Sequence, residues 1–152
     1  MKLWLLRHGE AEPRARTDAQ RNLTEAGRAE VQSSAAALRG QPLQAILASP
    51  YARAQQTAEI VRQTIGFEGR VETVPWATPD SDLGDALLYL DRRSEQSLLL
   101  VTHQPFVGAL GGWLVSGHRE TPLPMATASL AELEGEQIAA GLMHLLDLKH
   151  PR

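Results

Sequence analysis

Histidine and arginine side chains occur in three short polar segments of the sequence, each following an apolar run. Arg7 and His8 follow the first run, Arg53 lies shortly after the second, and His103 follows a third. An imidazole can act as a nucleophile near neutral pH because much of it is unprotonated around its reference pKa of about 6.5. A guanidinium group matches phosphate oxygens with paired N–H donors and stays charged. These residue types together indicate a site for a phosphoryl group.

Each of these residues also has a structural interpretation when it is taken alone. A single histidine at a strand end is more often structural than nucleophilic, and Arg53 could be a solvated surface residue. Arg7, however, ends a buried strand and must find an anion or a carboxylate there. Arg53 is expected in the first turn of a helix, where the helix dipole favours an anion and disfavours a cation. Because it follows a strand as Arg7 and Arg53 do, His103 is interpreted as a phosphate ligand or a proton donor.

The elements that would position these residues alternate between strands and helices. Apolar runs predict strands at 2–6, 45–48, 71–74 and 97–101, and helices are expected at 24–38, 49–64, 82–93 and from the turn at 102–105 to about 115. Segments 128–133 and 141–148 are expected to form a hairpin. The pattern predicts an α/β fold: a three-layer α/β/α sandwich with a mostly parallel central sheet of about five or six strands and a C-terminal antiparallel hairpin.

The expected strands also predict where the polar segments meet. Arg7 and His8, the segment 49–53, and Thr102 with His103 each follow the carboxyl end of a strand. Ligands of open α/β sheets bind at that edge. Ser49 and Pro50 are expected to begin the second helix as its cap and its first residue. We therefore expect one site at the carboxyl edge of the sheet.

The composition limits the classes of protein that fit the chain. The 152 residues suit one domain spanning 1–152, and 43% hydrophobic with 22% charged residues is ordinary for a globular chain. Cysteine is absent, which excludes disulfides and thiolate chemistry. A net charge of −3 argues against a nucleic-acid or anionic-membrane partner. The N-terminal apolar run is too short for a signal peptide or a membrane span, so a cytoplasmic location is expected. We also expect a monomer.

Longer stretches around the same residues carry a family resemblance. The segments are Leu-Arg-His-Gly-Glu (6–10), Ser-Pro-Tyr-Ala-Arg-Ala-Gln-Gln-Thr-Ala (49–58) and Val-Thr-His-Gln-Pro (101–105). In this order, each after a strand, they resemble the three signatures of the histidine phosphatase, or phosphoglycerate-mutase-like, superfamily. The short chain and the segment 21–27 further resemble its small SixA-like phosphohistidine phosphatases.

The resemblance implies a mechanism and a set of site residues. His8 would attack phosphorus and become phosphohistidine, which water would then hydrolyse. Arg7, Arg21, Arg53 and His103 would hold the phosphoryl oxygens, with no metal and no cofactor. Fixed cations can supply the positioning and charge neutralisation that phosphoryl transfer needs. Arg21 also has a plain interpretation as a solvated loop residue.

One departure from the family pattern bears on the substrate. Ester-cleaving members usually carry a glutamate general acid soon after the third strand, whereas here no Glu occurs between Glu72 and Glu95 and Trp76 stands in that region. Asp80 or Asp82 could replace the acid, although both equally suit a turn or a helix cap. An alkoxide leaving group needs a proton, but imidazole leaves more easily. The missing acid therefore favours a phosphohistidine substrate.

Four functions stay open at this point. The first is a phosphatase acting on phosphohistidine of signalling or phosphotransfer proteins, which a short chain with little room for a lid would suit. The second is a phosphatase of the same mechanism acting on small phosphomonoesters. The third is a non-catalytic phosphate-binding module. The fourth, a metal hydrolase built on His8, Glu10 and His103, is disfavoured because the surrounding arginines would repel a cation.

Overall fold

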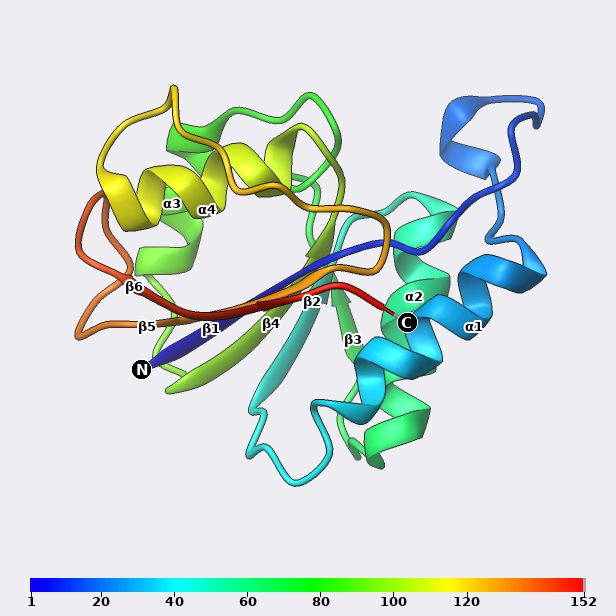
Figure 1. Ribbon diagram of the computed structural model, residues 1–152, viewed down its shortest axis with the longest axis horizontal. Coiled ribbons are helices and arrows are strands. Elements are labelled where there is room, and N and C mark those ends of the chain that lie inside the picture. The colour runs from blue at the N-terminus through cyan, green and yellow to red at the C-terminus, as the bar shows by residue number, and fades with distance from the viewer. Residues whose placement is uncertain (152) are drawn as a thin grey trace.

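The computed structural model describes residues 1–151 and consists of a six-stranded sheet with helices on both faces (Figure 1). The strands are β1 (Lys2–Arg7), β2 (Ala45–Ala48), β3 (Val71–Thr73), β4 (Ser97–Thr102), β5 (Leu130–Glu134) and β6 (His144–Lys149). The helices are η1 (Asp18–Gln20), a 3₁₀ turn, and the α-helices α1 (Glu25–Ala36), α2 (Ala52–Ile65), α3 (Leu83–Asp91) and α4 (Phe106–Ser116).

The strand order of the sheet is β3-β2-β4-β1-β5-β6. The pairs β3–β2, β2–β4 and β4–β1 are parallel, whereas β5 and β6 join antiparallel. β1 and β4 occupy the centre and are buried over most of their length, which explains why both read as continuous apolar runs. The expected α/β class, mostly parallel sheet and C-terminal hairpin are confirmed.

Two layers of helices cover the sheet. Figure 1 shows α1 and α2 on one face and α3 and α4 on the other. Because successive strand residues point to opposite faces, neighbours in β1 belong to different cores. Leu5 belongs to the core that includes Leu110 of α4, and Leu6 to the core that includes Val31 of α1. The three-layer prediction is therefore confirmed.

Two helix starts agree with the sequence and a third does not. The Thr24 hydroxyl accepts the Gly27 N–H at 2.9 Å, and the Asp82 carboxylate accepts the Asp85 N–H at 3.0 Å, so each side chain caps its helix. The expected start of α2 at Ser49 is wrong. The helix begins at Ala52 behind an extended Tyr51, and the Ser49 hydroxyl bonds elsewhere.

The hairpin strands also begin later than expected, at Leu130 and His144. The first residues expected in each strand, Ala128 and Gly141, have positive φ angles of 57° and 73°. This left-handed backbone lies outside the strand region. Both residues therefore belong to the turns that lead into β5 and β6.

Candidate active site

Three neighbouring strands bring the predicted residues to one edge of the sheet. Arg7 ends β1 and pairs in register with Thr102, which ends β4. β2 runs parallel to β4, so Ser49 emerges at the same edge. The imidazoles of His8 and His103 consequently lie with their ring centroids 5.0 Å apart, at an angle of 62°.

The two ring nitrogens of His8 have different partners. Nδ1 lies 2.7 Å from the carbonyl oxygen of Gly9, and the Nε–H of Arg53 points at Nε2 across 3.3 Å. A carbonyl oxygen only accepts and a guanidinium only donates. Nδ1 therefore carries the proton and Nε2 carries a lone pair, as a nucleophile requires.

The surroundings of His8 keep the imidazole neutral. The side chain is buried, and burial is the main reason why its pKa is lowered to about 4; the charges of Arg53, Arg7 and Arg21 act in the same direction. At neutral pH the proton on Nδ1 is thus the only one that the ring holds.

Gly9 allows the backbone after His8 to lie directly against α1. A Cβ on Gly9 would come within 2.5 Å of the carbonyl oxygen of Gly27, and one on Gly27 within 2.0 Å of the carbonyl oxygen of Glu10. The Gly9 N–H donates to the Thr57 hydroxyl of α2 at 3.2 Å. Both helices of this layer therefore hold the turn that carries His8.

Arg53 lies in the first turn of α2 and is almost completely buried. Besides its contact with His8, it donates from Nη1 to the carbonyl oxygen of Asp18 at 2.7 Å and from Nη2 to the Asp18 carboxylate at 3.1 Å. The guanidinium also lies 5.1 Å from the ring centre of Tyr51. Its plane is therefore held from several sides.

Asp18 joins a second arginine to this group, and sequence reasoning missed it. Its carboxylate accepts from Nη1 of Arg21 at 2.7 Å, while Nε of Arg21 donates to the carbonyl oxygen of Glu12 at 2.6 Å. The hydrogen bond from Arg21 is the main reason why the pKa of Asp18 is lowered, and the hydrogen bond from Arg53 acts in the same direction. The carboxylate is ionised at neutral pH and is a poor proton donor. An acid three residues before Arg21 was the available signal.

Two buried polar atoms at this edge have no hydrogen-bond partner within residues 1–151. One is Nε of Arg7, whose Nη1 donates to the carbonyl oxygen of Met125 at 3.0 Å. The other is Nδ1 of His103, whose Nε2 lies 2.7 Å from the Ser49 hydroxyl. Buried polar atoms are normally satisfied. These two atoms beside a neutral imidazole are therefore candidates to bond a ligand.

The segment after β3 gives its side chains local roles. Trp76 stacks on Tyr89 of α3, with ring centres 5.9 Å apart and planes 6° from parallel. Asp80 accepts from the Thr78 hydroxyl at 3.1 Å, and Asp82 caps α3. Both acids therefore have the turn and cap roles that were the plain alternative to replacing the missing glutamate.

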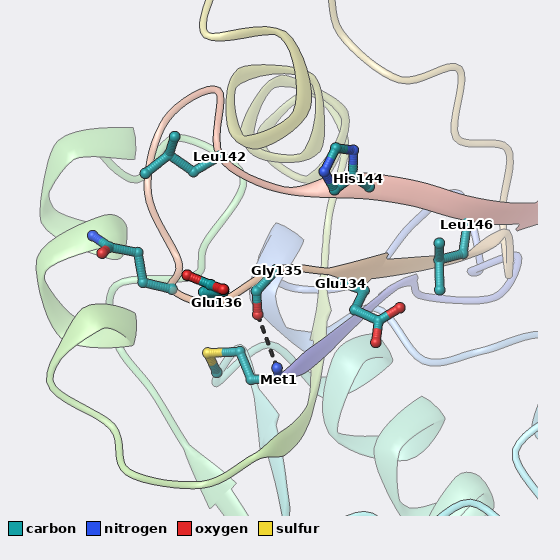
Figure 2. Close-up of a pocket in the computed structure, with 8 residues that line it drawn as sticks. Met1, Glu134, Gly135, Glu136, Leu142, His144 and Leu146 are labelled. Carbon is teal, nitrogen blue, oxygen red and sulfur yellow. Dashed lines mark hydrogen bonds between the residues drawn. The ribbon is translucent and has the colours of Figure 1, made fainter.

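A groove of about 580 Å³ lies at the other end of β1, beside Met1. Figure 2 shows its lining, in which the Met1 amino group donates to the carbonyl oxygen of Gly135 at 2.8 Å. The carboxylates of Glu134 and Glu136 line this groove together with apolar side chains. Acidic groups suit a phosphoryl group poorly, so the candidate site remains the edge that carries His8.

Across 1–151, no set of three or more His, Asp or Glu side chains is arranged to hold a metal ion. None of the helices in that range has the length and apolar character that a bilayer crossing requires.

The fold and this edge define a class of protein: an α/β phosphoryl-transfer enzyme with a neutral histidine among arginines. Comparison with known proteins agrees. Residues 3–75 match the model of the histidine phosphatase superfamily (branch 1). Phosphohistidine phosphatase SixA of Escherichia coli is 33% identical over 93% of this chain and 89% of its own, and the SixA homolog of Haemophilus influenzae is 32% identical over 88% and 87%.

A solved structure agrees as well. The protein histidine phosphatase SixA in complex with tungstate superposes with a TM-score of 0.89 at 31% identity, covering 99% of this chain and 97% of that one. This chain belongs to the histidine phosphatase superfamily, in its SixA-like branch, and is a hydrolase of that family.

Proposed function

We propose that this protein hydrolyses phosphohistidine on other proteins through a covalent phosphohistidine intermediate at His8. The observation that carries the proposal is the state of His8, a neutral, buried imidazole whose Nε2 lone pair faces Arg53. Beside it lie the atoms of Arg7 and His103 that have no hydrogen-bond partner within residues 1–151. The relatives named phosphohistidine phosphatase SixA support the choice of substrate.

In the first step, Nε2 of His8 forms a bond to phosphorus while the P–N bond of the substrate breaks. The electron pair of that bond goes to the leaving imidazole nitrogen, which takes a proton from solvent. Nδ1 of His8 keeps its proton and donates it to the Gly9 carbonyl oxygen 2.7 Å away, and this contact stabilises the charge that the ring acquires. Arg7, Arg53 and His103 donate to the phosphoryl oxygens.

In the second step, water attacks the phosphorus of phosphorylated His8. The P–Nε2 bond breaks, its electron pair returns to Nε2, and inorganic phosphate leaves with the oxygen of water. Arg21 lies at the rim of the site, where its guanidinium is partly exposed and bonded to Asp18. We assign it to an outer phosphoryl oxygen, which it would reach from the loop before α1.

The leaving group explains why this site favours a P–N bond over a P–O bond. The carboxylate next to Arg53 is that of Asp18, whose lowered pKa keeps it ionised at neutral pH, so it has no proton to donate. An alkoxide would leave without a proton donor there, whereas imidazole is a better leaving group. The rim is also accessible: residues 12–18 are all exposed. A phosphorylated side chain on a protein surface can approach it.

The test compares substrates on one enzyme preparation. We expect kcat/KM for a phosphohistidine protein to exceed that for a sugar phosphate or a phosphoserine peptide by at least about 100-fold, and turnover to vanish in His8→Ala. His118→Ala, which changes an exposed histidine, should behave as wild type. A sugar phosphate hydrolysed far faster than the phosphohistidine protein would overturn the assignment of substrate, and turnover surviving in His8→Ala would overturn the nucleophile.

A cytoplasmic location and a monomeric state are further parts of the proposal. Cell fractionation with an antibody against the native chain tests the first. Sedimentation of the purified protein tests the second, with about 16.6 kDa expected for one chain.

A further inference from the structure

Ser49 is a fully buried hydroxyl at the active-site edge of the sheet. It follows β2 directly, and α2 does not begin until Ala52, so the side chain does not cap the helix. Its oxygen accepts the N–H of Tyr51 at 3.2 Å and lies 2.7 Å from Nε2 of His103. Ser49, which the sequence predicted as a helix cap, thus contacts His103, a proposed phosphate ligand, instead.

The Ser49 hydroxyl has one hydrogen-bond acceptor within reach among residues 1–151. The contact with Tyr51 uses a lone pair of the oxygen, because a backbone N–H only donates. A buried hydroxyl proton needs an acceptor. Among the hydrogen bonds of residues 1–151, the acceptor available to Ser49 is Nε2 of His103. The hydroxyl therefore donates to Nε2, which must carry a lone pair.

We propose that Ser49 is a positioning residue that fixes the tautomer of His103, placing the ring proton on Nδ1 so that it donates to a phosphoryl oxygen. This inference rests on the function proposed above. Nδ1 of His103 is buried and has no hydrogen-bond partner within residues 1–151, so its hydrogen-bonding capacity is unused by the described chain. In the other tautomer the Nδ1 lone pair would face the phosphoryl oxygens and repel them.

The tautomer matters because His103 holds a single ring proton at neutral pH. Burial lowers the pKa of His103 to about 3, and the neighbouring His8 and Arg53 act in the same direction. A doubly protonated ring would donate from both nitrogens and would not need Ser49. A neutral ring donates from one nitrogen only, so the residue bonded to the opposite nitrogen decides which one.

The ring plane is held as well as its tautomer. His103 lies between His8 and Tyr51, with ring centres 5.0 Å away on each side and interplanar angles of 62° and 67°. These edge-on contacts limit rotation of the imidazole. Ser49 then needs to supply only the hydrogen bond that selects the protonated nitrogen.

Long-range ¹H–¹⁵N NMR of histidine side chains tests the inference without any substrate. In the wild type at pH 7 we expect a protonated Nδ1 and an unprotonated Nε2 for His103, with its signals assigned by their loss in His103→Asn. A protonated Nε2 in the wild type would overturn the inference and would leave the proposed function standing. In Ser49→Ala we expect both tautomers to be populated.

Kinetics provide the second arm. Ser49→Ala should lower kcat/KM for a phosphohistidine protein and weaken tungstate binding by about 10- to 100-fold, as losses of residues that orient a functional histidine do. Ser49→Thr, which keeps the hydroxyl, should retain more activity. Ser97→Ala is the matched control, because Ser97 is a buried serine at the opposite end of β4 and should stay within about twofold of wild type.

The two arms separate this inference from the proposed function. A wild type that fails to hydrolyse phosphohistidine proteins but shows the expected tautomer would refute the substrate and keep the role of Ser49. Full activity in a folded Ser49→Ala protein would refute the role of Ser49 and keep the substrate.

Discussion

The Nε–H of Arg53 donates to Nε2 of His8 across 3.3 Å. The contact joins the first turn of α2 to the end of β1 and covers the lone pair that would attack phosphorus. In the function proposed above, a phosphoryl group entering the site would take this N–H for one of its oxygens, which would free the lone pair. The same guanidinium would thus protect the nucleophile before binding and hold the electrophile afterwards.

Replacement of Arg53 by lysine tests that geometry. Lysine keeps the positive charge but cannot donate to Asp18 and to His8 from one plane. We expect kcat to fall about 10²- to 10³-fold in steady-state assays, as when one preorganised donor is removed from an anion site. Arg39→Lys, at an exposed position of the chain, should match wild type. An Arg53→Lys protein with unchanged kcat would show that charge alone suffices.

The protonation of His8 should begin only in strongly acidic solution. Its pKa is lowered to about 4, so the imidazole remains neutral as the pH falls through 6.5 and gains its proton near 4. A ¹H NMR titration of the ring, assigned with His8→Ala, should show no midpoint between pH 8 and 5. A midpoint near 6.5 would mean that burial and the arginines do not control this residue.

The same shifts predict how folding stability depends on pH. In the unfolded chain His8 and His103 bind protons below about pH 6.5, whereas the folded protein keeps both neutral until about 4 and about 3. The unfolded state therefore binds more protons in this window, and the free energy of unfolding falls as the pH falls. Each histidine contributes a slope of about 1.4 kcal/mol per pH unit where its two pKa values differ fully.

Urea unfolding between pH 6.5 and 5 measures that slope. The window stays above the ordinary range of carboxylate titration, which keeps the carboxylates out of the comparison. His8→Asn combined with His103→Asn should remove most of the dependence. A wild-type stability that is flat across this window, or that rises toward acid, would contradict the lowered pKa values.

Asp18 is expected to contribute modestly, by restraining two arginines. Its side chain is 56% exposed and bonds Arg21 and Arg53. Exposed ion pairs are worth up to about 1 kcal/mol, so Asp18→Asn should raise KM by roughly fivefold or less and leave kcat within about twofold. The control is Asp91→Asn at an exposed site. Tighter tungstate binding in Asp18→Asn would instead show that the carboxylate competes with the phosphoryl group.

The strands and the edge at which they end could be predicted because both depend on local pattern. Buried apolar runs predicted β1, β2 and β4. The parallel pairing of these strands places Arg7 beside Thr102 and brings Ser49 to the same edge of the sheet. His8 and His103 follow from that placement. The close approach of Gly9 to Gly27 was less visible, because it depends on how α1 packs.

The contacts between loops could not be predicted in the same way. Asp18 reaches Arg53 across 35 positions of the sequence, and the carbonyl oxygen of Met125 reaches Arg7 across 118. Hydrophobic periodicity in the sequence does not predict contacts between loops so far apart along the chain. Ser49 was misassigned because a serine before a proline is a good helix start, and only the position of His103 shows that its hydroxyl has another partner.

The most direct test of the central claim is to find phosphate on Nε2 of His8. Wild-type protein mixed with a phosphohistidine protein and quenched within milliseconds should carry acid-labile, base-stable phosphate on the peptide that contains Arg7, His8 and Gly9. His8→Ala should carry none and should not turn over. Turnover of the phosphohistidine protein by His8→Ala, or phosphate found on a different residue of the wild type, would contradict the account.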